Sequence, residues 1–148
     1  MVLDFDKLKD EIVTLLEREQ SITLATSVNG KVTARTMSHV NDGLLILFQT
    51  GGNSEKVNQI KANKNIAFAV ANVQVEAVAG IYSHPLKDEI FCGKYRKKFP
   101  QYFDKYTGYP DEILVKASIT KATLYKYIGG KPCRDILLIS QNKAYREF

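Results

Sequence analysis

The dipeptide Asn29-Gly30 is the feature that most constrains how this chain can fold. It follows residues 21–28, in which apolar and hydroxyl side chains alternate with the period of two that a half-buried strand requires. Asn-Gly is the strongest short signal for a two-residue hairpin turn, because both positions of that turn need a positive φ angle. The sequence therefore predicts a hairpin whose second strand is residues 31–38.

Further elements follow this hairpin along the chain. Turn residues and apolar runs predict strands at 44–50, 66–71, 73–82, 113–127 and 135–140, and Asn41-Asp42-Gly43 is expected to turn into the first of these. Residues 66–71 are nearly all apolar, so we expect that strand to be covered on both faces. Helices are predicted at 4–19, where Asp4 can cap the start, at 54–62, and at 87–106, where Pro100 should introduce a break.

Hairpins in series with a few helices predict a mainly β fold. We expect an antiparallel sheet rolled into a small barrel, with helices that flank or plug it. The length of 148 residues fits one domain, residues 1–148, or one domain that completes itself as a dimer. No strand or helix is assigned to the tail at 141–148.

Composition limits the expected cellular location of the protein and the kinds of partner it binds. No segment approaches the ~18 consecutive apolar residues of a transmembrane helix, and the acidic N-terminus does not look like a secretory signal, so a cytoplasmic protein without a membrane partner is expected. The net charge of +5 favours an anionic partner or simply solubility, but no nucleic-acid-binding motif accompanies it. Cys92 and Cys133 lie in no CxxC pair, and His39 and His84 are far apart, so free thiols and no metal site are expected.

A glycine-rich segment connects the predicted strand at 44–50 to the helix at 54–62. Gly51-Gly52 precedes a helix start that carries Ser54 and Lys56. Free N–H groups and the positive end of the helix favour an anion there, with the Ser54 hydroxyl and N–H and the Lys56 ammonium as ligands. Thr50 can donate from the strand end. The alternative is structural: Ser54 as an ordinary N-cap, Lys56 as a solvated residue, and Thr50 as a residue that favours strands.

Arg35 is the second candidate ligand for an anion. Its guanidinium can hold a phosphate through two hydrogen bonds, and if its strand pairs with the strand before the glycines, Arg35 and Lys56 can contact the same anion. Together they indicate a phosphorylated cofactor or substrate. The alternative is an outward-facing arginine in a weak surface ion pair.

Other residues give weaker signals. His39 is a possible proton donor or stacking partner, although a surface position is favoured for it. The basic and aromatic stretch from Tyr95 to Tyr106 fits packing against the barrel better than a stacking platform for single-stranded nucleic acid. No nucleophile and base can be paired from the sequence, so no catalytic residue is named.

Taken in order, these features resemble the pyridoxamine 5′-phosphate oxidase-like flavoproteins, and within them the general-stress-protein branch. The resemblance rests on the helix, the Asn-Gly hairpin, the R-x-M strand, the apolar strand, T-x-x-x-S-x-K and Q-I-x-x-N, and it is strongest over residues 22–80. It implies a split β-barrel that binds FMN, and a homodimer with FMN at the interface. It also implies that the cofactor supplies most of the chemistry, in an oxidoreductase that acts on an unidentified small molecule.

The resemblance also implies roles for particular residues. Arg35 matches the phosphate-binding arginine of the family. The backbone from Thr36 to Ser38, with Met37 between them, would run beside the isoalloxazine ring. The residues that match the phosphate-binding loop are Thr50, Ser54 and Lys56.

The chain departs from the family pattern at Glu55 and in its C-terminal segment. Many relatives have an arginine where this chain has Glu55, which removes a cation. The chain has no Trp and a different C-terminal segment, so true pyridoxamine 5′-phosphate oxidase activity is not expected. The excursion at 85–110 is expected to shape the substrate side. A flavin-binding stress protein without turnover, or a relative that uses haem or a deazaflavin, stays open as an alternative.

Overall fold

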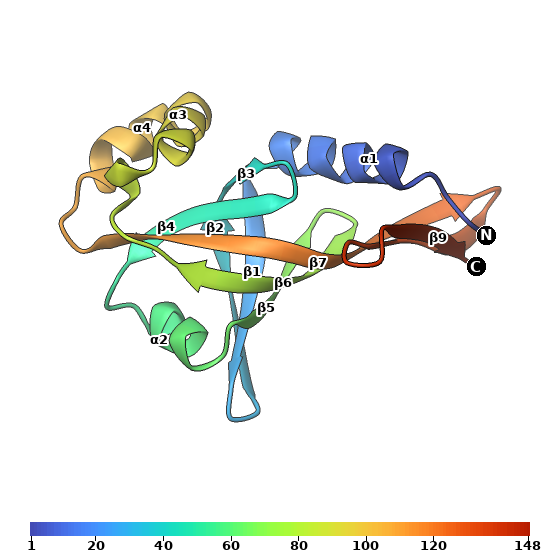
Figure 1. Ribbon diagram of the computed structural model, residues 1–148, viewed down its shortest axis with the longest axis horizontal. Coiled ribbons are helices and arrows are strands. Elements are labelled where there is room, and N and C mark those ends of the chain that lie inside the picture. Colours follow the sequence, from blue (N-terminus) through green and yellow to red (C-terminus); the bar gives the residue numbers. More distant parts are fainter.

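The computed structural model describes residues 1–148 and consists mainly of one antiparallel sheet with flanking helices (Figure 1). The helices are α1 (Phe5–Arg18), α2 (Glu55–Ala62), α3 (Glu89–Lys98) and α4 (Pro100–Tyr102), with a 3₁₀ turn η1 (Pro85–Lys87) and a wide turn η2 (Phe103–Thr107). The strands are β1 (Ser21–Val28), β2 (Lys31–Ser38), β3 (Val40–Asp42), β4 (Leu45–Gly51), β5 (Asn65–Val70), β6 (Val73–Ile81), β7 (Glu112–Ile128), β8 (Lys131–Leu138) and β9 (Lys143–Glu147).

The sheet curls but does not close. Its strands follow the order β2-β1-β5-β6-β7-β4-β3, and β8 and β9 continue from the far half of the long strand β7. Strands β2 and β3 end the path without pairing to each other. The predicted mainly β, split-barrel fold is confirmed, whereas a fully closed barrel is not formed. Helix α1 and the α3–α4 excursion lie on one side of the sheet, and α2 lies on the other (Figure 1).

The Asn-Gly hairpin forms as predicted. Asn29 and Gly30 have φ angles of 52° and 78°, which are the positive values that a two-residue turn requires. The register that follows pairs Val28 with Lys31 and Thr26 with Thr33. The turn thereby places the two threonines opposite each other, facing helix α2.

The tail, for which no element was predicted, forms β9, which pairs with β8 along its length. Two predictions about strands are wrong. Asn41 and Asp42 belong to the short strand β3, and the turn consists of Gly43, whose φ is 58°, and Leu44. Strand β5 is not covered on both faces: its large residues point inward, but Ala69 is exposed on the outer face.

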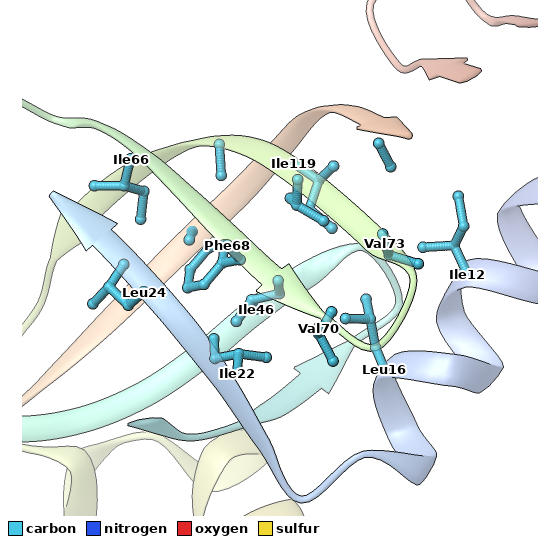
Figure 2. Close-up of a cluster of buried hydrophobic side chains, with 14 of the residues drawn as sticks. Ile12, Leu16, Ile22, Leu24, Ile46, Ile66, Phe68, Val70, Val73 and Ile119 are labelled. Carbon is cyan, nitrogen blue, oxygen red and sulfur yellow. The ribbon is translucent and has the colours of Figure 1, made fainter. Parts of the chain in front are cut away.

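The main core lies between α1 and the concave face of the sheet (Figure 2). Ile12 and Leu16 of α1 are fully buried against residues from β1, β5 and β6. Phe68 of β5, which is 2% exposed, is one of the largest side chains in this cluster. The helix is amphipathic, and the Asp4 carboxylate caps its start by accepting a hydrogen bond from the Lys7 N–H at 3.0 Å.

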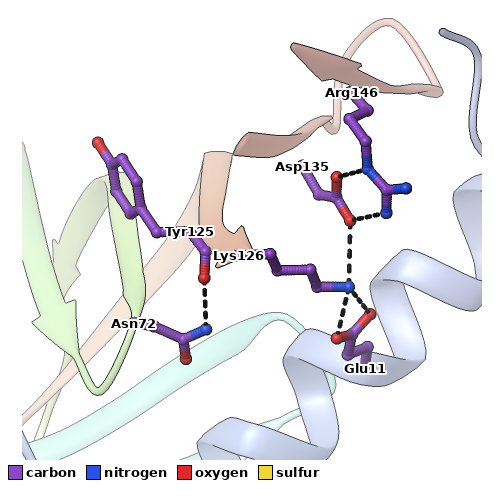
Figure 3. A network of polar contacts seen from close by, with 6 residues as sticks. All are labelled: Glu11, Asn72, Tyr125, Lys126, Asp135 and Arg146. Atoms are coloured by element: carbon purple, nitrogen blue, oxygen red, sulfur yellow. Dashed lines mark hydrogen bonds and ion pairs between the residues drawn. The ribbon is translucent and has the colours of Figure 1, made fainter. Parts of the chain in front are cut away.

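A buried carboxylate fastens the two ends of the chain together (Figure 3). Asp135 on β8 accepts hydrogen bonds from Arg146 Nε and Nη2 at 2.6 and 2.8 Å. Lys126 Nζ lies 3.1 Å from the same carboxylate and 2.8 Å from Glu11 of α1. The network therefore ties β7, β8 and β9 to the N-terminal helix.

The segment after β6 leaves the sheet as a helical excursion. Pro100 ends α3, as predicted, and the chain continues through α4 and η2. A second apolar cluster holds the excursion against β3, β4 and β7; it comprises Val40, Leu47, Phe91, Tyr95, Phe99, Phe103 and Leu114. None of the helices is both long and apolar enough to cross a membrane.

Candidate functional site

Lys56 is a half-buried cation at the start of α2 that pairs with no carboxylate. Its Nζ donates a hydrogen bond to Thr50 Oγ1 at 2.8 Å, which links the helix to the end of β4. Burial lowers the pKa of Lys56, and the positive charge of Arg35 lowers it further. The ammonium forms no ion pair with any acidic residue of the chain. Lys56 therefore sits where a bound anion would be stabilising.

Arg35 is the second half-buried cation without a carboxylate partner. Its guanidinium donates to Thr26 Oγ1 at 2.8 Å, to Thr33 Oγ1 at 2.7 Å and to Gln59 Oε1 at 3.1 Å. All three acceptors are neutral, and Gln59 belongs to α2. The surface ion pair that was the alternative for Arg35 does not form. Arg35 instead fastens α2 onto the β1–β2 hairpin.

Helix α2, not strand pairing, brings the two cations together. The hypothesis that the strands of Arg35 and of the glycine loop pair as a hairpin is wrong, because β2 pairs with β1 whereas β4 pairs with β3 and β7. Lys56 and Gln59 are three residues apart in α2 and so lie on neighbouring positions of its surface. Because Gln59 binds Arg35, the helix holds Lys56 within reach of the charge of Arg35.

Ser54 occupies the N-cap of α2 but makes no capping hydrogen bond. Its hydroxyl is buried and has no partner. The prediction that its N–H is free is wrong, because that group donates to the Gly51 carbonyl at 3.1 Å. The Gly52 N–H is not free either, because it donates a hydrogen bond to the carbonyl oxygen of Asp111 at 2.7 Å. The hydroxyl of Ser54 and the N–H groups of the first helical turn are the donors that remain.

A hollow of about 430 Å³ opens beside these groups. It brings together four of the predicted site residues: Thr36, Met37, Ser38 and Thr50. The hollow is not lined by Arg35, Ser54 or Lys56. Lys56 is connected to it through a hydrogen bond to Thr50, which does line it. The other lining residues are Gln49, Gly51, Tyr95, Tyr102, Tyr106, Tyr109 and Glu112.

Gln49 and Glu112 line this hollow but were not among the predicted site residues. Gln49 ends the apolar run of β4 inside the strand, and a polar residue at such a place is the signal that could have identified it. Its Oε1 is buried without a partner. Glu112 lies opposite Gly51 in the β4–β7 register. Burial raises the pKa of Glu112, and the charge of Asp111 adds to the effect. Burial likewise raises the pKa of Tyr95 to about 12.

The prediction that His39 is a surface residue is wrong. Its side chain is completely buried, and Nε2 lies 2.9 Å from the carbonyl oxygen of Leu16. Burial lowers the pKa of His39 to about 4, and the charge of Lys98 contributes in the same direction. His39 does not line the hollow. Its position between α1 and the start of β3 indicates a structural role.

Comparison with known proteins agrees with this fold. The sequence model of the family described as pyridoxamine 5′-phosphate oxidase matches residues 8–126, from α1 almost to the end of β7. The match covers most of the sheet, both cations and the loop between them. The chain belongs to this family.

General stress protein 26 of Bacillus subtilis (strain 168) is a relative by sequence. It is 30% identical over 102 residues, which are 62% of this chain and 73% of the relative. Among solved structures, ChuZ of Campylobacter jejuni has a TM-score of 0.74 at 18% identity, over 95% of this chain and 63% of ChuZ. At that identity the structural likeness shows the shared fold.

Other proteins of the same fold are named for different ligands. A FAD-binding protein of Mesorhizobium loti has a TM-score of 0.64 at 11% identity, over 76% of this chain and 87% of its own. HutZ, the haem storage protein of Vibrio cholerae, has a TM-score of 0.63 at 15% identity, over 76% of this chain and 89% of HutZ. An F420 reductase has a TM-score of 0.57 at 24% identity, over 74% of this chain and 93% of the reductase. The fold alone therefore does not select one cofactor.

Proposed function

We propose that this chain is an FMN-binding flavoprotein, and that Arg35, Lys56 and Ser54 hold the phosphate of FMN. One observation carries the proposal: two half-buried cations lie close enough for one to lower the pKa of the other, and neither forms an ion pair with a carboxylate. A phosphate dianion offsets both charges. It also supplies acceptors for the unpartnered Ser54 hydroxyl and for the first turn of α2.

The rest of the cofactor would lie in the adjacent hollow. Thr36, Met37 and Ser38 line it on the β2 side, which is where the family resemblance expects the isoalloxazine ring, and Thr50 joins it to the cations. When bound, FMN supplies the electron-transfer chemistry. The residues of the chain then fix the orientation of the ring, and the tyrosines of the excursion restrict the access of water to it.

A homodimer with FMN at its interface is part of the same proposal. Strand β2 is an edge of the sheet, and its outward side chains are exposed; Val32 is 67% exposed. An exposed edge strand beside the hollow is suited to pairing with, or being covered by, a second copy of the chain. Membership of the family supports this assembly.

The activity that we propose is an FMN-dependent oxidoreductase acting on a small molecule other than pyridoxamine 5′-phosphate. The test begins with the visible absorption spectrum of the purified protein, after FMN has been added. The bound flavin is then reduced with NAD(P)H or dithionite and reoxidised with candidate acceptors. Bound FMN that undergoes these cycles supports the oxidoreductase.

The same experiment separates the alternatives. FMN that binds tightly but cannot be cycled by any of these reagents favours a flavin-binding stress protein without turnover. The names of HutZ and of the F420 reductase motivate parallel titrations with haemin and with a deazaflavin. Saturable binding of either one, together with no binding of FMN, contradicts the proposal.

A further inference from the structure

The excursion after β6 places a continuous row of aromatic rings along the hollow. Consecutive ring centroids are 4.9, 5.1, 5.7, 6.1 and 5.9 Å apart, within the range of favourable aromatic pairs. The rings, in order, are those of Phe91, Tyr95, Phe99, Tyr102, Tyr106 and Tyr109. The first three are buried in the apolar cluster under α3, so the row is anchored at that end.

The other end of the row is open. Tyr102, Tyr106 and Tyr109 are 47%, 37% and 49% exposed, and all three line the hollow. We call these three residues the tyrosine wall. Because the wall continues a packed row, little conformational freedom remains to be lost when a flat ring stacks on it. The wall is therefore suited to a planar ligand.

The lining of this hollow contains a carboxylate and no cation. Glu112 is the only charged residue that lines it, and Gln49 contributes a buried oxygen without a hydrogen-bond donor. Lysines line the two other large hollows along the excursion. Asp111 raises the pKa of Glu112 further, whereas His84 and Lys56 act in the opposite direction. A ligand that carries a positive charge and N–H donors fits these acceptors.

Cations already lie over aromatic rings in this excursion. Lys105 Nζ is 5.3 Å from the centroid of Tyr106, and the guanidinium carbon of Arg96 is 4.4 Å from that of Phe103. Electron-rich ring faces attract cations, and the attraction increases where water is partly excluded. The half-buried carboxylate of Glu112 adds a second source of attraction for the same charge.

We propose that the tyrosine wall, Glu112 and Gln49 form a binding subsite for a planar aromatic cation. The ring would stack on the wall, its charge would face Glu112, and an N–H group would donate to Gln49 Oε1. This assigns a substrate class to the flavin site, and only in that respect does it rest on the proposed function. The subsite itself needs no bound flavin.

The experiment uses three probes with the same ring size and different charge: 1-methylnicotinamide as the cation, nicotinamide as the neutral ring, and nicotinate as the anion. Each is titrated by calorimetry into the full chain, with and without FMN. We expect the cation to bind about tenfold more tightly than the neutral probe, and the anion more weakly than both. Equal binding of all three probes, or no binding at millimolar concentrations, overturns the proposal.

Two variants and a control locate the subsite. Glu112→Gln keeps the shape of the side chain, so it should remove most of the preference for the cation while leaving nicotinamide binding unchanged. Tyr106→Leu should weaken binding of both rings, and that of the cation more, because the cation also loses its attraction to the ring face. Asp104→Asn removes an exposed charge from the same excursion and should change nothing. A charge preference that survives Glu112→Gln undiminished contradicts the assignment.

FMN binding is measured separately on every variant, through the quenching of flavin fluorescence. If FMN does not bind but the cation preference and its loss in Glu112→Gln are observed, the proposed function fails and the subsite stands. If FMN binds with no preference among the probes, the subsite fails and the flavin proposal stands.

Discussion

Arg35 lowers the pKa of Lys56, although the two residues come from elements that do not pair in the sheet. Gln59 makes this possible, because it accepts a hydrogen bond from Arg35 while it lies one turn beyond Lys56 on α2. Two like charges held together in this way destabilise each other until an anion binds. The proposed phosphate site would therefore be largely formed before its ligand arrives.

Arg35→Ala should weaken FMN binding by about 1.5–3 kcal/mol, the range for a hydrogen bond to a charged group. It should affect riboflavin, which lacks the phosphate, far less. Arg35→Lys retains the charge without the planar guanidinium, so its FMN affinity should lie between those of the unmodified protein and of Arg35→Ala. Fluorescence titration of both flavins measures the difference. Equal losses for FMN and riboflavin would contradict the assignment of Arg35 to the phosphate.

A control is needed because Arg35 also holds α2 against the hairpin. Gln59→Leu removes the shared acceptor of Arg35, Thr26 and Thr33 but keeps both cations. We expect this variant to reduce the free energy of unfolding while retaining most of the preference for FMN over riboflavin. A preference lost as completely as in Arg35→Ala would mean that Arg35 acts through the position of α2.

Glu55→Arg should strengthen FMN binding, because it replaces a carboxylate at the start of α2 with the cation that many relatives carry there. The same change should lower the free energy of unfolding by about 0.3–1 kcal/mol, because Glu55 interacts favourably with the helix dipole. It also removes the hydrogen bond from Gln59 Nε2 to Glu55 at 3.3 Å. Paired FMN titrations and urea unfolding curves test both parts, and unchanged FMN affinity would argue against a phosphate beside residue 55.

His39 should make the protein less stable as the pH falls from about 6.5 to about 4. The folded state holds this residue neutral, so the unfolded state binds the extra proton first. The full shift corresponds to about 3 kcal/mol of stability that is present above the ordinary pKa of histidine and lost on acidification. Urea unfolding across this range should give a slope that His39→Gln flattens. An identical slope in the variant would show that other groups cause it.

Asp135→Asn should lower the free energy of unfolding by about 3 kcal/mol, because Lys126 and Arg146 lose their buried partner. Hydrogen bonds from Arg146 hold the pKa of Asp135 below its usual range, so its contribution is present above that range and is lost as the pH falls through the lowered value. Thermal unfolding at neutral pH measures the change. Glu147→Gln, which breaks only the exposed pair with Arg134, is the matched control and should cost less than about 1 kcal/mol.

Much of the fold could be predicted, because local signals and packing agree. The Asn29-Gly30 turn sets its own register, and the apolar spacing of α1 matches the face that it buries. His39 was misjudged because a single histidine has no local pattern that reports burial. Whether it is exposed depends on α1 covering the start of β3, which is a long-range contact.

The site was only partly predictable for the same reason. Thr50, Ser54 and Lys56 form a contiguous motif, so their proximity follows from the loop itself. The partners of Arg35 are fixed by how α2 docks on the hairpin, which no spacing along the chain reveals. Glu112 and Tyr109 come to the hollow from a distant segment, through the pairing of β4 with β7 and the course of the excursion.

The most direct test of the proposed phosphate site is a comparison of FMN and riboflavin binding to the unmodified protein, followed through the quenching of flavin fluorescence. We predict saturable binding of FMN that is tighter than that of riboflavin by at least about tenfold, since the phosphate meets two cations and an unpartnered hydroxyl. Equal affinity for both flavins would contradict the phosphate site, and binding of neither would contradict the flavoprotein.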